Sequence, residues 1–189
     1  MAVHPPNKEM LCDECEMNMM TMTINCHNPL CPNNECNKHK PSKEPPPELT
    51  NWDIRFLTMA KHIGLWSKDP SSKCGAIISR NKVMISSGFN GFPANTDDYP
   101  EIYEDRERKY LRVIHAEINA ILYAKCDLTG CTLYCTLPPC CQCTAAIIQS
   151  GISKVIYNSP DQSFIDRWKD HIHESKRMFS EAGVVIVEY

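Results

Sequence analysis

Two short motifs, His115-Ala116-Glu117 and Pro139-Cys140-Cys141-Gln142-Cys143, have to meet in space if this chain is to hold a metal ion. An imidazole and two thiolates are ligands that Zn²⁺ prefers, and three protein ligands leave one tetrahedral position open for water. Glu117 would then stand beside the metal as a carboxylate that can move protons. The fold must therefore bring the segment that begins at His115 against the segment that begins at Cys140.

The spacing within each motif predicts where two helices begin. Cys140 and Cys143 are three residues apart and can share one face of a helix, whose first position suits Pro139. The positive end of the helix dipole at that start favours two thiolates. His115 and Glu117 are two residues apart, which in mid-helix would point them about 200° apart. They can converge only if His115 sits at the helix start.

Read together, H-x-E followed by P-C-x-x-C is the signature of the zinc-dependent cytosine and adenine deaminases. A C-x-x-C pair alone is usually a structural zinc site or a redox pair, and His-x-Glu is common by chance. The two motifs occur in order, with a strand-like segment at Cys131–Thr136 between them, and this combination favours the enzyme. Cys141 lies between two predicted ligands and is not itself predicted to bind the metal.

Length, charge and cysteine usage limit the class of protein. The 189 residues suffice for one domain with an appendage, and the net charge of −3 without a basic stripe argues against a nucleic-acid partner. No apolar run approaches membrane-spanning length, and Met1–Leu11 lacks a signal-peptide core. Twelve cysteines without an export signal indicate metal binding and buried thiols rather than disulfides. We expect a soluble, cytoplasmic protein, in the host cytoplasm if the chain is viral.

Residues 1–47 differ from the rest in composition, with many Asn and Pro residues, few large aliphatics and a proline-rich linker at Pro41–Pro47. Their candidate metal ligands are Cys12, Cys15, Cys26, His27, Cys31, Cys36 and His39. Such a segment buries little apolar surface, so a metal would have to order it. Cys12 and Cys15 form a zinc knuckle that Cys31 and Cys36 could complete, although spacing does not decide among the later ligands. The alternative is a disordered tail with incidental thiols.

Hydrophobic periodicity divides residues 48–189, the predicted catalytic domain, into alternating helices and strands. We expect a helix over 52–67, a hairpin of Gly75–Ser79 and Val83–Ser87, strands at Cys131–Thr136, Lys154–Tyr157 and Val184–Val187, and a long helix lined by Phe164, Trp168, Ile172 and Phe179. Cys74, Cys126, Cys131 and Cys135 are expected to be small core residues. The segment Thr96–Arg112 is a charge-dense insertion.

Two stretches outside the metal motifs are candidates for substrate binding. Asn90 precedes Gly91, which is a strong turn signal, but its amide could also bind a sugar hydroxyl over the pocket. Arg106 and Lys109 lie beside Tyr110 just ahead of the first metal motif, where they could bind a phosphate. A charge run is usually a solvated face, and these residues alone do not decide between the two interpretations.

Several motifs in order resemble the deoxycytidylate (dCMP) deaminases, phage and viral members among them. These motifs are Ser67-Lys68-Asp69-Pro70-Ser71, Gly88-Phe89-Asn90-Gly91, His115-Ala116-Glu117-Ile118-Asn119-Ala120, Pro139-Cys140-Cys141-Gln142-Cys143 and Ile147-Ile148-Gln149-Ser150-Gly151-Ile152. The resemblance covers about Asn51 to Tyr189. It implies the α/β cytidine-deaminase fold, a five-stranded mixed sheet flanked by helices that carry the zinc ligands.

The resemblance also implies a reaction, a substrate and a form of control. The reaction is hydrolytic deamination of dCMP to dUMP and ammonia, which supplies dUMP for thymidylate synthesis. We expect the base, sugar and phosphate to contact Asn90, Ala116, Leu137, Pro138, Arg106, Lys109 and Tyr110. Relatives form homo-oligomers, often hexamers, while a dimer is also open here, and many are regulated by dCTP and dTTP. The corresponding effector residues here are Lys68, Asn90, Gly91 and Phe92, and some phage relatives hold a second, structural zinc.

Three rival functions remain open at this point. The first is deamination of another cytosine nucleotide or nucleoside, chiefly dCTP, dCMP and dCTP together, or deoxycytidine. The second is deamination of a base in single-stranded nucleic acid or tRNA, against which the acidic charge balance argues. The third is a catalytically idle zinc-binding module. An intact Glu117 discriminates against that module, because a scaffold has no need of the carboxylate.

Overall fold

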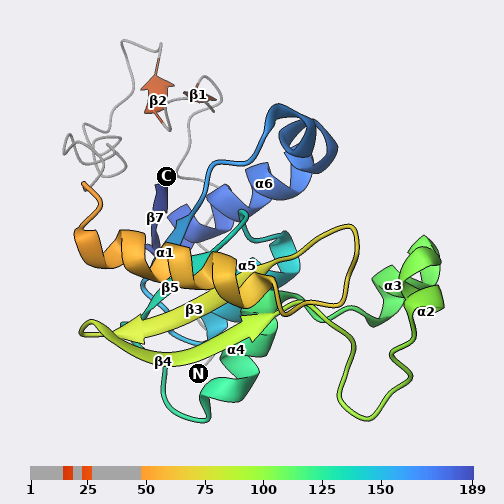
Figure 1. The fold of residues 1–189 in the computed structure, drawn as a ribbon. Coiled ribbons are helices and arrows are strands. Elements are labelled where there is room, and N and C mark those ends of the chain that lie inside the picture. Colours follow the sequence, from red (N-terminus) through yellow and green to blue (C-terminus); the bar gives the residue numbers. More distant parts are fainter. Residues whose placement is uncertain (1–14, 19–22, 27–47) are drawn as a thin grey trace, which may run out of the picture. The chain divides into compact units, whose positions relative to one another are not determined.

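The computed structural model describes residues 15–18, 23–26 and 48–189 of the chain (Figure 1). The chain divides into two compact units, Met1–Pro47 and Glu48–Tyr189. In the first unit, β1 (Cys15–Asn18) and β2 (Thr23–Cys26) pair antiparallel, with the backbone of Cys15 opposite that of Cys26. Within the described residues, no helix combines the length and the apolar character needed to cross a membrane.

The second unit is built on a five-stranded mixed sheet. Its strands are β3 (Gly75–Arg80), β4 (Val83–Phe89), β5 (Thr132–Cys135), β6 (Lys154–Tyr157) and β7 (Val185–Glu188). They lie in the order β4-β3-β5-β6-β7. β3 is antiparallel to both of its neighbours, whereas β5, β6 and β7 run parallel. This arrangement confirms the predicted sheet and the predicted hairpin.

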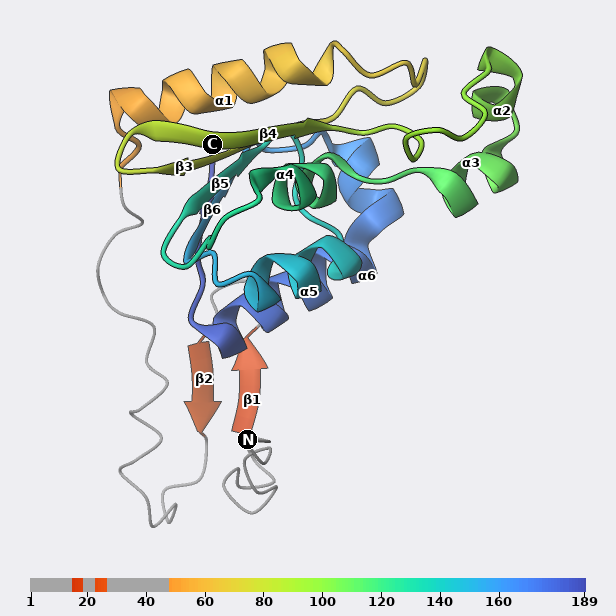
Figure 2. The same ribbon diagram turned by 90° about the horizontal axis from the view of Figure 1, so that it is seen from below.

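Helices cover both faces of the sheet, as Figure 2 shows. These are α1 (Asn51–Gly64), α4 (Ala116–Ala124), α5 (Cys141–Gln149) and α6 (Gln162–Ala182), whereas α2 (Pro100–Glu104) and α3 (Arg106–Arg112) lie beyond the end of the sheet. α1 packs on one face, where Ile77 and Tyr134 lie in its core cluster. α4, α5 and α6 pack on the other face over Ile78 and Leu133. Neighbouring strand residues thus enter opposite cores, as the two-residue period of a strand requires.

Four details differ from the sequence-based expectations. α1 ends at Gly64 instead of continuing to 67, and a Cβ atom at Gly64 would lie about 3 Å from the backbone of residues 73–75. The insertion contains two helices, α2 and α3, which its charge density concealed. Cys126 is exposed rather than buried, and Cys74 is only half-buried, whereas Cys131 and Cys135 do belong to the core.

The fourth difference concerns the start of α5. Pro139 does not occupy the first helical position, because Cys140 has an extended backbone (φ −74°, ψ 168°) and forms the N-cap. Pro139 therefore lies one residue before the cap. The expected proximity of the two thiols does not depend on this shift, since Cys143 is still three residues further along the chain.

Gly88 allows α4 to lie directly against the sheet. A Cβ atom at this position would come within 2.3 Å of the Ala116 carbonyl oxygen and 2.4 Å of the Ala120 nitrogen. Nearby, the Asn119 side-chain amide donates a hydrogen bond to the Phe89 carbonyl at 2.8 Å. The start of α4, where the first metal motif lies, is therefore fixed against β4.

Candidate active site

The predicted zinc ligands lie at the starts of two helices. His115 is the N-cap of α4, with extended backbone angles (φ −71°, ψ 156°), so the prediction that it sits at the helix start is confirmed. Cys140 is the N-cap of α5, and Cys143 lies in its first turn. Neither helix has a side-chain cap of its own. The N-termini of both helices thus contribute to one site.

The three side chains are arranged as zinc requires. Nδ1 of His115 lies 3.5 Å from Sγ of Cys140 and 3.3 Å from Sγ of Cys143. All three ligand atoms lie within 4.8 Å of one another. Zinc–nitrogen and zinc–sulfur bonds of ordinary length at a tetrahedral angle would separate nitrogen from sulfur by roughly 3.6 Å. These residues fit a zinc ion without rearrangement.

Cys141 does not belong to this group. Its Sγ donates to the carbonyl oxygen of His171 in α6 at 3.5 Å. Among the described residues, the only cluster suited to a metal consists of His115, Cys140 and Cys143. The structure thus places Cys141 as the sequence interpretation required, outside the three-ligand set.

The protonation of the two thiols is coupled. The hydrogen bond with Cys143, helped by His115, lowers the pKa of Cys140 to about 3. The same hydrogen bond and burial raise the pKa of Cys143. The pair therefore shares one proton while one sulfur is a thiolate, and a bound metal would displace that proton. The hydrogen bond with Cys140 raises the pKa of His115, although burial opposes this effect.

Glu117 is a carboxyl group enclosed by the protein. Only 7% of the residue is exposed. Burial raises its pKa above the usual value, and the neighbouring His115 acts in the opposite direction. A carboxyl group with a raised pKa close to the metal ligands can both accept and return a proton near neutral pH.

A pocket of about 950 Å³ opens over these groups, a volume near the upper end of the usual range for small-ligand sites. Of the predicted site residues, those that line it are Asn90, Arg106, Lys109, Tyr110, His115, Glu117, Leu137, Pro138 and Cys140. Ala116 lies at the first position of α4, next to His115. Cys143 is buried beneath. The residues nominated for metal, proton transfer and substrate are thus brought together from four parts of the chain.

The two basic residues nominated for a phosphate differ in their surroundings. The side chain of Arg106 is exposed, and its guanidinium lies 5.3 Å from the centre of the Tyr110 ring. Lys109 is buried, and its ammonium group lies 3.3 Å from a carboxylate oxygen of Asp69. Arg106 is therefore free to meet a ligand, whereas Lys109 already has a protein partner.

Both polar atoms of the Asn90 amide contact the backbone. Oδ1 accepts from the Cys74 amide at 2.8 Å, and Nδ2 donates to the Ser72 carbonyl at 2.9 Å. Asn90 is 5% exposed and lines the pocket. It therefore supports the loop ahead of β3, and one amide hydrogen and one oxygen lone pair are left for a ligand.

The other nominated effector residues lie outside the pocket lining. Lys68 is exposed and pairs with Asp98 at 2.6 Å. The backbones of Gly91 and Ile114 form a bridge, and the Phe92 ring stacks on Tyr103 with the ring centres 4.2 Å apart. The Lys68 pair thus joins the loop after α1 to the insertion, and the Phe92–Tyr103 stack joins the chain after β4 to α2.

Sequence reasoning missed a buried relay that holds the second metal motif. The Thr144 hydroxyl donates to Ser175 at 3.0 Å, and the Ser175 hydroxyl donates to the Pro139 carbonyl at 2.9 Å. Thr144 and Ser175 are at most 3% exposed. The relay fixes the peptide before Cys140 from α6. Because Ser175 is distant in sequence and typical of a helix surface, no local pattern marked it.

α6 also supplies pocket residues that were not nominated. Phe164, Arg167 and Trp168 line the pocket, and the helix deviates from helical geometry at Trp168 (φ −115°, ψ 15°). The sequence interpretation placed Phe164 and Trp168 on one face of a long helix. Both side chains are half-exposed in the structure. The sequence could not show that they line the pocket, because this depends on how α6 packs in the fold.

The nominated N-terminal ligands are not placed by the structure. Cys12, Cys31 and Cys36 lie outside the described residues, and for Cys15 the structure describes only the backbone in β1. A second zinc site in this unit therefore stays a prediction.

Comparison with known proteins supports one family. Residues 50–159 match the family described as the cytidine and deoxycytidylate deaminase zinc-binding region. The chain is 46% identical over 138 residues to an uncharacterized deaminase in the luxG 3′ region of Aliivibrio fischeri, covering 73% of this chain and 93% of that protein. It is 35% identical over 150 residues to human deoxycytidylate deaminase, covering 75% and 82% of the two chains.

Among solved structures, the chain is similar to a dCMP deaminase from the cyanophage S-TIM5, which has been crystallised with dCMP and dUMP. The TM-score is 0.58 at 22% identity, and the match covers 75% of this chain and all of the phage chain. At this identity the likeness shows the fold, which is that of the cytidine deaminases.

Proposed function

Because the chain belongs to the cytidine and deoxycytidylate deaminase family, we propose that it hydrolyses dCMP to dUMP and ammonia. The observation that carries the proposal is the position of His115 between the sulfurs of Cys140 and Cys143, with buried Glu117 beside them in one pocket. The names of the curated relatives support the choice of dCMP among the cytosine nucleotides.

The residues of the pocket have separate tasks in this reaction. A zinc ion bound by His115, Cys140 and Cys143 would make a water molecule acidic enough to attack carbon near neutral pH. Glu117 accepts the first proton of that water and delivers it to N3 of the cytosine ring. It then takes the proton of the hydroxyl group added at C4 and delivers it to the departing amine. The Ala116 amide and the Leu137–Pro138 segment frame the edge of the base.

The rest of the nucleotide would extend toward the mouth of the pocket. Asn90 retains hydrogen-bonding capacity for a sugar hydroxyl. Arg106 is exposed, lines the pocket and packs over Tyr110, and we assign the phosphate contact to it. A guanidinium can donate two parallel hydrogen bonds to a phosphate group, and a nucleoside has no phosphate to accept them.

A substrate panel tests the proposal. Purified full-length protein loaded with zinc is incubated with dCMP, dCTP, deoxycytidine, CMP and a single-stranded oligonucleotide, and released ammonia is measured. We expect kcat/KM to be highest for dCMP. A preference for dCTP or deoxycytidine would identify a different cytosine deaminase, and turnover of the oligonucleotide alone would identify a polynucleotide deaminase. If no compound is turned over, the protein is a catalytically idle zinc-binding module.

We further propose that the N-terminal unit binds a structural zinc through Cys12 and Cys15, completed by Cys31 and Cys36. Ordering a backbone costs roughly 1–2 kcal/mol per residue, which this aliphatic-poor segment cannot offset by burial. Zinc binding can supply on the order of 10 kcal/mol. We expect native mass spectrometry to find two zinc ions per chain, and one after deletion of residues 1–47. One zinc in both proteins would contradict the site.

Control by nucleotides and assembly also remain proposals. We propose that the protein is a cytoplasmic homo-oligomer that responds to dCTP and dTTP through Lys68, Asn90, Gly91 and Phe92. The contacts of Lys68 and Phe92 support this, since they reach the insertion, which lines the pocket: Lys68 from the loop after α1, and Phe92 from the chain after β4. Light scattering measures the assembly. Adding dCTP or dTTP to the dCMP assay measures the response, and an unchanged rate with both would contradict it.

A further inference from the structure

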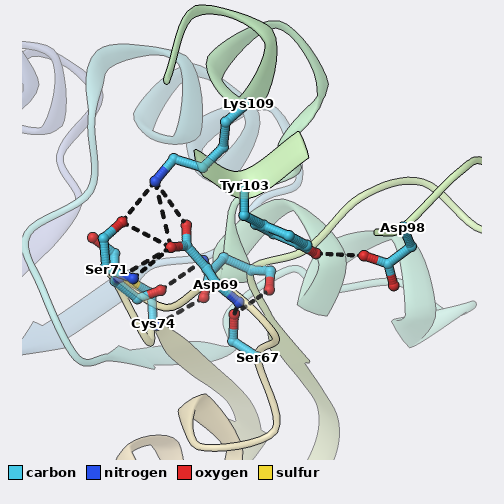
Figure 3. A network of polar contacts seen from close by, with 9 residues as sticks. Ser67, Asp69, Ser71, Cys74, Asp98, Tyr103 and Lys109 are labelled. Carbon is cyan, nitrogen blue, oxygen red and sulfur yellow. Dashed lines mark hydrogen bonds and ion pairs between the residues drawn. The ribbon is translucent and has the colours of Figure 1, made fainter. Parts of the chain in front are cut away.

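Lys109 is a buried cation in the pocket wall, and its ammonium group is already paired with protein groups. Nζ lies 3.3 Å and 3.4 Å from the two carboxylate oxygens of Asp69 and 2.6 Å from the hydroxyl oxygen of Ser71 (Figure 3). The side chains of Lys109 and Asp69 are 8% and 3% exposed. Of the three donors of the ammonium group, two are hydrogen-bonded to Asp69 Oδ1 and Ser71, and the charge is paired with the Asp69 carboxylate.

Asp69 in turn organises the loop that follows α1. Its Oδ1 accepts hydrogen bonds from the Ser71 amide and hydroxyl, both at 2.8 Å, and from the Ser72 amide at 3.2 Å. Burial alone would raise the pKa of Asp69, but the bonds from Ser71 and the charge of Lys109 together lower it. The carboxylate therefore stays charged, and the ion pair joins α3 to the loop.

The same loop is fastened on its other side by the end of β4. The Ser67 hydroxyl donates to the Asn90 carbonyl at 2.8 Å, and the Asn90 amide holds the backbone of Ser72 and Cys74. Residues 69–75 all line the pocket. Asn90 and Lys109 thus hold this wall from two sides. Two ion pairs tie it to the insertion that carries Arg106: the buried Lys109–Asp69 pair and the more exposed Lys68–Asp98 pair.

We propose that Lys109 is a positioning residue, which fixes the 67–74 wall against α3, and that it does not bind the phosphate. The proposal rests on the proposed deamination of dCMP. The proposal gives different roles to two cations of α3. Arg106 binds the phosphate, and Lys109 fixes the position of the wall against which the nucleotide binds.

Two substrates separate these roles, because deoxycytidine lacks the phosphate. We expect Lys109→Met to lower kcat/KM for dCMP and for deoxycytidine by the same factor, at least about tenfold, as misplacement of substrate groups does. The preference for dCMP over deoxycytidine should then be unchanged. Arg106→Met should instead lower kcat/KM for dCMP alone. A loss in Lys109→Met confined to dCMP, or no loss on either substrate, would overturn the proposal.

Asp69→Asn gives an independent test if Lys109→Met folds poorly. A lysine released from its partner would bind a phosphate better, so a phosphate-binding Lys109 predicts a stronger preference for dCMP in this variant. A positioning role predicts a loss shared by both substrates. Lys176→Met, which breaks a half-exposed ion pair with Glu188 far from the pocket lining, is the matched control and should leave both values unchanged.

Hydrogen exchange provides a readout that does not depend on activity. We expect the amides of residues 67–74 to exchange faster in Lys109→Met than in the wild type, while those of β6 keep their rates. Unchanged exchange in the loop would contradict the positioning role. If the wild type deaminates neither substrate, the proposed function fails while this measurement still decides the role of Lys109.

Discussion

Glu117→Gln is expected to abolish turnover while the protein keeps its zinc. The amide has nearly the shape of the carboxyl group but can neither accept nor deliver the proton. General acid–base groups contribute about 10²–10⁴-fold to rates, and a group that serves several transfers belongs at the upper end, so we expect kcat to fall by about 10⁴-fold. Steady-state kinetics with dCMP, together with metal analysis of the same sample, measures both quantities.

Glu107→Gln is the matched control for this change. Glu107 is an exposed carboxylate on α3 outside the pocket lining, so its neutralisation should leave kcat unchanged. Near-normal turnover of a zinc-loaded Glu117→Gln protein would show that another group moves the protons. Loss of zinc from that variant would instead show that the carboxylate supports the metal site.

Replacement of His115, Cys140 or Cys143 by Ala is expected to remove both the catalytic zinc and the activity. Each substitution leaves two ligands at a site that needs three. The loss should be complete rather than graded, because the same ion prepares the attacking water. Metal content after gel filtration and product formation from dCMP are the two measurements.

Cys141→Ala controls for the removal of a thiol from the same helix. Its Sγ contacts the His171 carbonyl in α6 and lies outside the three-ligand cluster. The variant should keep its zinc and its turnover. If Cys141 proved necessary for zinc content while Cys140 or Cys143 did not, the assignment of the metal motif would be wrong.

The metal motifs could be predicted from the sequence because their chemistry is local. Ligand type and spacing within a few residues determined that His115 had to begin a helix, and the structure has it as an N-cap. The five strands were also recognisable from their apolar runs, and their pairing order follows the fold that the motifs indicated. Element ends were less predictable, as the start of α5 shows.

The walls of the pocket could not be predicted, since they depend on contacts between distant residues. The Lys109–Asp69 pair and the Ser175–Pro139 hydrogen bond each join segments far apart in the sequence. From the sequence, a basic side chain in a charged run is expected to be exposed to solvent. Its burial can be recognised only when the fold shows a carboxylate beside it. The helices α2 and α3 were not predicted either, because few of their residues are apolar and no hydrophobic periodicity marks them.

The close contact at Gly88 fixes the metal-binding end of the pocket, whereas the rest of the pocket wall is formed by other segments. With no side chain at Gly88, the backbone at the start of α4 lies directly against β4, and His115 and Glu117 are held from the central sheet. The pocket walls away from the metal ligands belong instead to residues 69–75, the α2–α3 insertion and the start of α6. Substitutions in those segments can alter which nucleotide is accepted without moving the ligands or Glu117. The architecture therefore allows substrate range to diverge over evolution while the chemistry stays the same.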